Sequence, residues 1–219
     1  EATNAGYGDL NVTLSNGTHN STMNGALTVN GSMIVSGTGA AVHTFTLGGN
    51  AVIATSVVLG GTGTCTFNTG ANYSVTADSI NLNAAGKILT ANASTITLTG
   101  SGTGASRPFA VAGTFNAGTS TMIFTGTAAS EIQNTTYHHL SFLPASGSPT
   151  YTLGTAAAQT IRANGNFTIG NGTNAVTVTA AAYNPALDIR GSIFLLAANS
   201  VYTKGTGVTT FRSGTTQFV

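Results

Sequence analysis

The stretch GTGTCTF at Gly61–Phe67 opens with glycines and continues as threonines that alternate with apolar residues. Strict alternation of this kind predicts a short β-strand with one buried face, and the glycines predict a tight turn before it. Related stretches return as GTSTMIF at Gly118–Phe124 and as GTGVTTF at Gly205–Phe211. A second echo pairs Gly25–Val29 with Gly165–Ile169. Repetition of short strands predicts a stack of similar units.

Short alternating strands bounded by Asn-Gly or Gly-Gly turns occur along the whole chain of 219 residues, which predicts an all-β protein. We expect a parallel β-solenoid, in which each full turn (a coil) buries its apolar row only when a neighbouring coil covers it. The prediction is one domain over residues 1–219, with repeat units around 61–124 and 118–211. The repeat offsets fit coils of about 29 or about 19–22 residues. A β-sandwich or jelly roll is the alternative, because Asn-Gly is also the strongest hairpin signal.

Charged residues are scarce: six Lys or Arg and five Asp or Glu, or 5% of the chain, with a net charge of +1. An ordinary domain is about one quarter charged. Forty threonines and 18 serines must therefore fill many water-facing positions. Low charge also removes the repulsion that keeps monomers apart, which is typical of a polymer subunit or a glycan-covered surface. The basic residues are scattered singly, so no nucleic-acid partner is expected.

The single cysteine, Cys65, excludes an internal disulfide framework and is expected to be a buried small hydrophobe. No apolar run approaches the length of a membrane helix, so no membrane span is predicted. No charged-then-apolar leader precedes the first strands, and Glu1 reads as a processed end or as the start of an excerpt. Neither end carries the Pro-rich or charged segment that normally protects a β-edge, so open ends are expected to associate head to tail.

No residue is predicted to be catalytic, to bind a cofactor or to bind a metal. Asp188 and Arg190 share one face of a strand, and a local ion pair or a turn contact is the favoured interpretation. An enzymatic alternative, cleavage of a polysaccharide, needs a further carboxylate beside them. His138 and His139 are adjacent and point to opposite faces of a regular strand, so they cannot share one metal. We expect one of them to pack inward and the other to face solvent.

The outer surface suggests two further features. Nine asparagines stand in Asn-x-Ser/Thr sequences that a glycosylating host would recognise: Asn11, Asn16, Asn20, Asn30, Asn72, Asn92, Asn134, Asn166 and Asn171. Thr-x-Thr pairs such as Thr44/Thr46 predict hydroxyl ladders on one face of a sheet. Ice-binding solenoids use such rows at strict spacing, and the uneven spacing in this sequence argues against that role. The tyrosines are expected to pack in the core or at its rim.

Three segments carry a resemblance to a known family: Asn24–Ser32, Gly113–Thr119 and Thr136–Phe142. They resemble repeats of large secreted bacterial surface proteins, the filamentous-haemagglutinin-like and autotransporter-passenger-like proteins. The resemblance is clearest over residues 110–219, and phage tail-fibre segments are similar. His139 stands where the family commonly has asparagine. The resemblance implies a right-handed parallel β-helix and an extracellular, adhesive or fibre-forming role.

The sequence therefore predicts a non-enzymatic structural protein, a subunit or segment of a self-assembling filament at the microbial cell surface. Its expected partner is a second copy of itself in a head-to-tail homopolymer. The first alternative is an adhesin or glycan-binding protein, with a polysaccharide or a host surface as partner. The second alternative is the polysaccharide-acting enzyme on a β-helix.

Overall fold

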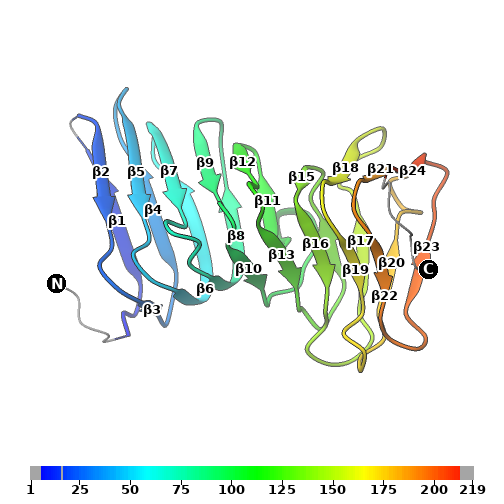
Figure 1. Ribbon diagram of the computed structural model, residues 1–219. Coiled ribbons are helices and arrows are strands. Elements are labelled where there is room, and N and C mark those ends of the chain that lie inside the picture. The colour runs from blue at the N-terminus through cyan, green and yellow to red at the C-terminus, as the bar shows by residue number, and fades with distance from the viewer. Residues whose placement is uncertain (1–5, 16, 213–219) are drawn as a thin grey trace. The chain divides into compact units, whose positions relative to one another are not determined.

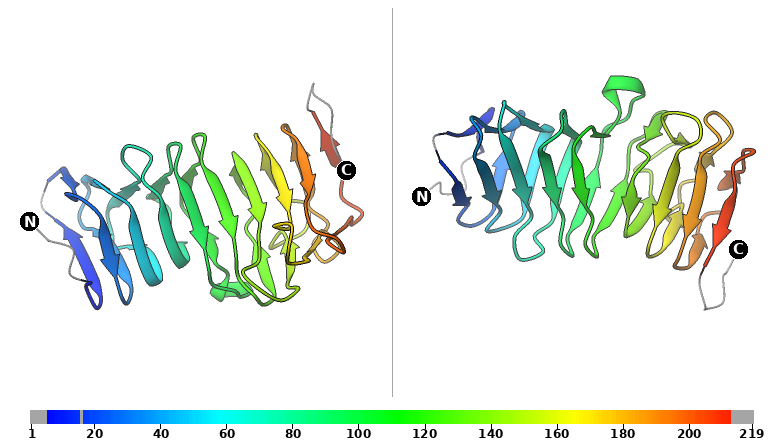
Figure 2. Two further views of the ribbon diagram at one scale, coloured as in Figure 1. Left: turned by 60° about the horizontal axis from the view of Figure 1, so that its bottom comes forward. Right: turned by 90° about the horizontal axis from the view of Figure 1, so that it is seen from above.

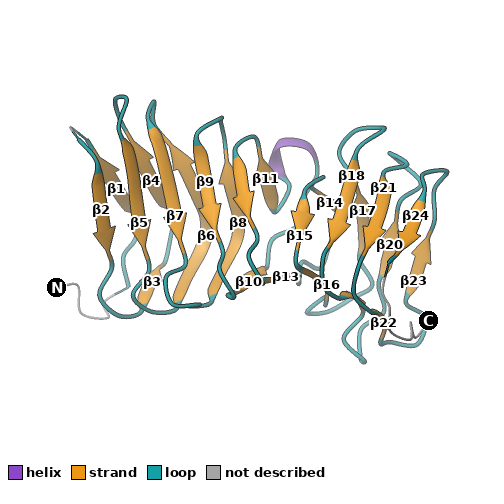
Figure 3. Cartoon of the chain, turned by 45° about the horizontal axis from the view of Figure 1, so that its top comes forward, coloured by secondary structure: helices purple, strands orange, loops and turns teal. Residues whose placement is uncertain are grey.

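The computed structural model describes residues 6–15 and 17–212 (Figure 1). This part of the chain is all-β, and its sheets stack as a β-solenoid of about eight coils. The strand pairs run parallel, as between β1 (Leu10–Leu14) and β4 (Met33–Gly37), which confirms the predicted solenoid over the hairpin-built sandwich. The only helical element of the described residues is the short 3-10 turn η1 (Gly104–Ser106), drawn purple in Figure 3.

The chain divides into two compact units, of which each is a stack of parallel strands (Figure 2). The first unit comprises residues 1–97 and 110–120, and the second comprises residues 98–109 and 121–219. The single domain predicted over residues 1–219 stays a prediction.

The first unit is built from two sheets. One has the order β1-β4-β6-β8-β10, with β3 beside β6 and β11 beside β8; the other has the order β2-β5-β7-β9-β12. The further bounds are β2 (His19–Thr22), β3 (Leu27–Val29), β5 (Val42–Thr46), β6 (Ala51–Gly60), β7 (Thr64–Asn68), β8 (Val75–Leu82), β9 (Lys87–Thr90), β10 (Thr95–Leu98), β11 (Phe109–Val111) and β12 (Thr114–Asn116).

The second unit has three strand ladders: β13-β16-β19-β22, β14-β17-β20-β23 and β15-β18-β21-β24. Each coil therefore contributes one strand to each of three ladders. The bounds are β13 (Thr121–Phe124), β14 (Ser130–Ile132), β15 (Thr136–Tyr137), β16 (His139–Phe142), β17 (Thr150–Leu153), β18 (Thr160–Ala163), β19 (Phe167–Ile169), β20 (Thr177–Thr179), β21 (Ala186–Ile189), β22 (Ile193–Leu195), β23 (Val201–Thr203) and β24 (Thr209–Phe211).

Coil length varies, because the loops absorb insertions while the strands stay in register. Leu10 pairs with Met33 and Met33 pairs with Val57, whereas Thr121 pairs with His139 after a much shorter excursion. The repeat offsets left coils of about 29 and of about 19–22 residues open, and no single length describes the coils of the structure. The three related stretches lie on β7, β13 and β24, which belong to three different ladders. The repeated stretches thus share the residue pattern of a strand, but their spacing does not give the length of a coil.

The core of each unit is a row of thin apolar layers. In the first unit Met33, Val57 and Ile80 occupy one register position in successive coils and are fully buried. In the second unit Phe142 is the centre of an aromatic cluster. Its ring centroid lies 5.7 Å from that of Phe124 and 5.0 Å from that of Tyr151. The alternation of the sequence places these side chains inside, because successive strand residues point to opposite faces.

Close stacking leaves no room for side chains at some corners. Gly118 has φ of +57°, and a Cβ atom there would lie 2.2 Å from the backbone oxygen of Asn92 in the coil beneath. Both the positive φ and the contact favour glycine. The glycines of the repeat are thus required by the approach of one coil to the next.

Replacing Phe142 by alanine tests the aromatic cluster. We expect Phe142→Ala to lower the unfolding free energy by about 3–5 kcal/mol, because it removes a fully buried ring and leaves a cavity. Chemical denaturation measures the loss. Val208→Ala is the control: its side chain is 68% exposed, and a change below about 0.5 kcal/mol is expected. Equal effects of the two substitutions would contradict this description of the core.

Candidate functional site: an open apolar end and an arginine cluster

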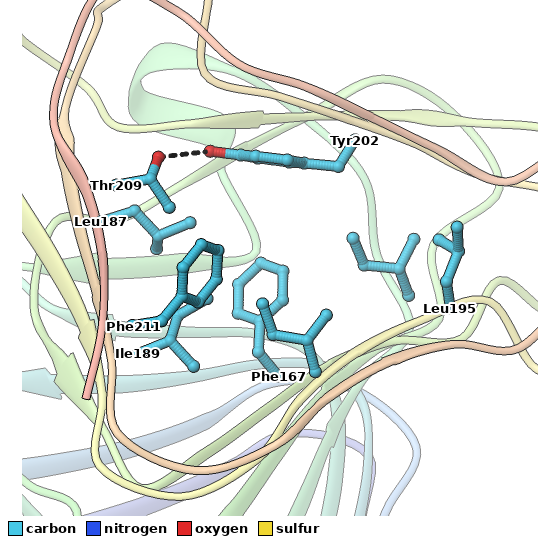
Figure 4. A pocket seen from close by; sticks show the side chains of 9 residues that line it. Phe167, Leu187, Ile189, Leu195, Tyr202, Thr209 and Phe211 are labelled. Carbon is cyan, nitrogen blue, oxygen red and sulfur yellow. Dashed lines mark hydrogen bonds between the residues drawn. The ribbon is translucent and has the colours of Figure 1, made fainter. Parts of the chain in front are cut away.

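The last described coil of the second unit leaves its apolar interior open. A pocket there is lined by side chains from β19, β21, β22, β23 and β24 that point toward one another (Figure 4): Phe167, Ile169, Leu187, Ile189, Ile193, Leu195, Tyr202, Thr209 and Phe211. Its one polar edge is the 3.3 Å hydrogen bond between the hydroxyls of Tyr202 and Thr209. Tyr202, expected at the core or its rim, thus lies at the rim of this pocket.

Exposed apolar residues concentrate on this coil. Seven large hydrophobic residues are exposed in the described part of the chain, and five of them lie between residues 195 and 211: Leu195, Leu196, Val201, Val208 and Phe211. Among residues 6–15 and 17–212, no further strand follows β22, β23 or β24 in its ladder. The coil therefore presents both apolar side chains and an unpaired strand edge, which is a ready template for another strand.

A second cluster gathers three arginines around one carboxylate on the β15-β18-β21-β24 ladder. Arg162 Nε lies 2.9 Å from Asp188 Oδ2, and Arg212 Nε lies 2.9 Å from Asp188 Oδ1. Arg190 Nη2 lies 3.4 Å from Asp188 Oδ2. Parallel register builds the cluster, because Arg162 on β18 pairs directly with Asp188 on β21. The Asp188–Arg190 ion pair was predicted from sequence and is confirmed; the other two partners come from neighbouring coils.

The cluster holds Asp188 in its charged form. Burial raises its pKa, but hydrogen bonds from Arg162 and Arg212 and the charges of Arg212 and Arg190 outweigh burial, so the pKa lies below its usual range. The enzymatic alternative needed a further carboxylate beside Asp188 and Arg190. The ion pairs of Asp188 with three arginines do not test that alternative, which stays a prediction.

Glu131 at the centre of β14 joins three segments of the second unit. Its carboxylate accepts hydrogen bonds from the Gly104 backbone N–H at 2.7 Å and from the Tyr183 hydroxyl at 2.7 Å. Arg107 Nη2 lies 3.5 Å away. The hydrogen bond to Glu131, followed by its negative charge, raises the pKa of Tyr183. The sequence alone did not indicate this cluster, because its members come from three separate segments, and Tyr183 follows Glu131 by 52 residues.

A column of titratable residues runs through the first unit, with three buried members and the exposed His19. His19, His43, Cys65 and Lys87 occupy the same register position on β2, β5, β7 and β9. Lys87 is 1% exposed, and its ammonium group donates to the backbone oxygens of Gly61, at 2.7 Å, and of Gly63. Its alternation with buried Leu89 was the signal that could have placed it inside.

Cys65 is fully buried, as predicted. Burial raises its pKa, although the Lys87 charge and a hydrogen bond from the Gly37 backbone act in the opposite direction. The neighbouring His43 is also fully buried, and its Nε2 lies 3.0 Å from the Thr38 oxygen. Its Nδ1 has no hydrogen-bond partner among the described residues. The column thus holds polar groups inside the stack.

The expectation for the histidine pair was wrong. His138 and His139 are both half-buried, and their rings meet edge to face with centroids 4.4 Å apart. Strand β15 ends at Tyr137 and β16 begins at His139, so the pair lies at a corner where strand alternation does not apply. Burial, followed by the neighbouring His138, lowers the pKa of His139.

Two features are absent from the described residues. No group of three or more His, Cys, Asp or Glu side chains there could hold a metal ion. No helix in that part of the chain is long and apolar enough to cross a bilayer.

The asparagines of the nine Asn-x-Ser/Thr sequences differ in accessibility. Asn11, Asn20, Asn30, Asn72 and Asn171 are exposed. Asn92, Asn134 and Asn166 are half-buried and hydrogen-bonded to neighbouring coils. Asn16 lies outside the described residues. Glycosylation stays a prediction, and the exposed group is where it is expected first.

Threonine ladders form despite the uneven spacing of the sequence. Thr44 pairs with Thr66, and Thr46 pairs with Asn68, on the outer face of the β2-β5-β7-β9-β12 sheet. Further along the same face the Asn116 amide donates to the Thr90 hydroxyl at 3.5 Å. The strands stay in register although the loops between them differ in length. The result is an uncharged row of hydrogen-bonding side chains.

Replacing Asp188 by asparagine tests the arginine cluster. We expect Asp188→Asn to lower the unfolding free energy by about 1–3 kcal/mol at neutral pH, because charge-assisted hydrogen bonds are lost and three cations lose their counter-charge. Asp9→Asn is the control; Asp9 accepts one hydrogen bond, from the Ser32 backbone, and its loss is expected to be smaller.

The difference in unfolding free energy between the wild type and Asp188→Asn is expected to depend on pH. Because the folded pKa of Asp188 lies below its usual 3.8, its contribution is complete above that value and is lost as pH falls through the folded pKa. The stability difference between wild type and Asp188→Asn is therefore expected to be constant above about pH 5 and to shrink in more acidic solution. A difference that grew on acidification would contradict the cluster.

Labelling of Cys65 tests the burial of the column. A disulfide reagent is expected to modify the native protein at least about a thousandfold more slowly than the denatured protein, because a buried thiol reacts only through opening of the fold. The absorbance of the released thiolate measures both rates. Equal rates would show that the thiol is accessible in the folded state.

No family model, no curated protein and no solved structure matches the chain. The resemblance to secreted bacterial β-helix proteins therefore stays a prediction from the quoted motifs. The two candidate functional sites of this β-solenoid are the open apolar coil and the arginine cluster.

Proposed function

We propose that this protein is a non-enzymatic structural protein, a segment of a self-assembling filament on a microbial cell surface. The observation that carries the proposal is the open coil formed by β22, β23 and β24. Its exposed apolar side chains include Leu195, Val201 and Phe211, and they line or flank a pocket that a further coil would fill. Covering such a layer removes apolar surface from water, which stabilises the joint by roughly 25 cal/mol for each Å² of apolar surface buried.

A second copy of the chain is the proposed cover. The strand edges of this coil offer backbone N–H and C=O groups in the parallel arrangement that the solenoid uses throughout. A coil added by another molecule would extend the same ladders, with no new kind of interaction. Head-to-tail contacts of this type produce a filament whenever the rotation does not close a ring.

The use of the acidic residues supports a structural role. Asp9 accepts a hydrogen bond from Ser32 in the next coil, Glu131 joins three segments, and Asp188 joins three arginines across neighbouring coils. These carboxylates connect successive parts of the stack. The nearly uncharged exterior, with 5% charged residues, also leaves little repulsion between adjoining molecules.

The extracellular location is part of the same proposal. A single buried cysteine places no demand on the redox compartment. The abundant threonine and asparagine, the exposed Asn-x-Ser/Thr sequences and the resemblance to secreted β-helix repeats all favour a surface role.

The assembly experiment places a charge on the open coil. The wild-type protein is expected to form fibres as its concentration rises, seen by negative-stain electron microscopy and as fast-sedimenting species. Leu195→Lys combined with Val201→Lys is expected to abolish them, because two ammonium groups would have to be buried at the joint. Circular dichroism verifies that the variant folds.

Val52→Lys is the matched control. Val52 is 51% exposed and lies on β6 in the first unit, so this substitution adds a charge away from the open coil and is expected to leave fibres intact. A wild-type protein that stays dispersed at every concentration would overturn the proposal. Equal assembly of the double variant and the wild type would do the same.

A further inference from the structure

The arginine cluster carries more positive charge than its own carboxylate neutralises. Three guanidinium groups surround Asp188, which leaves a local surplus of two positive charges on a chain whose total is +1. We propose that this cluster binds the carboxylate groups of an acidic polysaccharide. This binding site goes beyond the structural role and does not depend on filament formation.

The arginines keep donors for a ligand. Each uses one N–H toward Asp188: Nε of Arg162, Nη2 of Arg190 and Nε of Arg212. A guanidinium has five N–H donors. The side chains are 39%, 44% and 60% exposed for Arg162, Arg190 and Arg212, whereas that of Asp188 is 9% exposed. Asp188, the carboxylate that anchors the three arginines, is therefore covered, while the guanidinium groups remain open to solvent.

The anchor also reduces the entropic penalty of binding. A free arginine side chain loses about 2 kcal/mol of rotamer entropy when it is fixed. Here Asp188 already fixes two of the three guanidinium groups at 2.9 Å before any ligand arrives. Preorganised donors of this kind bind an anion more tightly than mobile surface lysines do.

The spacing of the cluster favours a linear ligand. Ile189 pairs with Phe211, so Arg190 and Arg212 follow at equivalent positions on neighbouring coils. Paired strands lie about 4.8 Å apart, and Arg162 stands one coil earlier, beside Asp188. The positive groups thus follow one another along the stacking direction. A chain with repeated carboxylates can meet them together, whereas a single small anion can use only part of the array.

The surroundings favour a carbohydrate. Thr136 and Thr210 stand in the same register column as Arg162 and Asp188, and Asn164 is exposed just after β18. These side chains are neutral hydrogen-bonding groups of the kind that sugar hydroxyls require. The site already binds a carboxylate, that of Asp188, through planar guanidinium groups, which is the geometry that a uronate would use.

The test uses a polymer of galacturonic acid and its methyl ester. Isothermal titration at low salt is expected to give saturable binding of the free acid and none of the ester, because esterification removes the charge and keeps the sugar backbone. The measurement is made on the Leu195→Lys/Val201→Lys protein, designed to stay dispersed, so that failure of this site and failure of assembly are separate results.

Single substitutions in that background assign the site. Arg190→Gln and Arg212→Gln are each expected to weaken binding about tenfold, the effect of losing one charge-assisted contact. Lys204→Gln is the matched control: Lys204 is an exposed cation of the same unit that makes no ion pair with Asp188, and its loss is expected to change affinity less than twofold. Arg190→Lys keeps the charge without the planar fork and should recover only part of the affinity.

Several results would overturn the proposal. Binding of the methyl ester as tightly as the acid would exclude carboxylate recognition. An equal loss in Lys204→Gln and Arg212→Gln would mean attraction by net charge alone. Tighter binding of duplex DNA than of the uronate polymer would assign the cluster to phosphate recognition. If Arg190→Gln also lowers the unfolding temperature, the Arg190→Lys protein is the test of Arg190. Unchanged affinity of that variant would show that binding does not require the planar guanidinium group.

Discussion

Coverage of each coil by the next is the constraint on which this structure depends. An apolar layer such as Met33, Val57 and Ile80 is thin, and within its own coil it has too few neighbours to exclude water. Parallel hydrogen bonds hold the next coil in place and close the layer. Stability is therefore a sum over neighbouring contacts, as in other repeat architectures. At the open coil of β22–β24 this sum is incomplete among the described residues, and an apolar pocket marks the missing contacts.

The same constraint explains where polar groups lie. Each coil must approach its neighbour closely, so corners use glycine, as at Gly118, or small hydroxyl and amide groups that bond across the gap. At one such corner the Thr69 hydroxyl donates to the Ala91 oxygen at 2.9 Å and accepts from the Ser94 hydroxyl at 2.7 Å. The abundance of threonine, serine and asparagine thus serves the interior corners as well as the outer faces.

Charge in this protein is local and shared between coils. Asp188 is surrounded by arginines that lie 26 residues before it, 2 residues after it and 24 residues after it. Glu131 gathers partners in the same way. Both clusters therefore strengthen the stacking of one coil on another. Because the chain has few other charged side chains, these clusters are also the positions where a charged ligand would find the strongest electrostatic attraction.

The sequence by itself predicted the strand-rich, parallel-stacked fold, the burial of Cys65 and the Asp188–Arg190 pair. The burial and the pair follow from alternation within one strand, and the stacking follows from the repetition of short strands along the chain. Only the tertiary structure decided which coil meets which. It placed the repeated stretches on different ladders, aligned threonines whose spacing in the chain is uneven, and moved His138 and His139 to a corner. The physical reason is register: loop length can vary without cost to the ladder, so contacts between coils cannot be counted from residue spacing. Arg162, Arg212 and the buried Lys87 acquired their partners through that register alone.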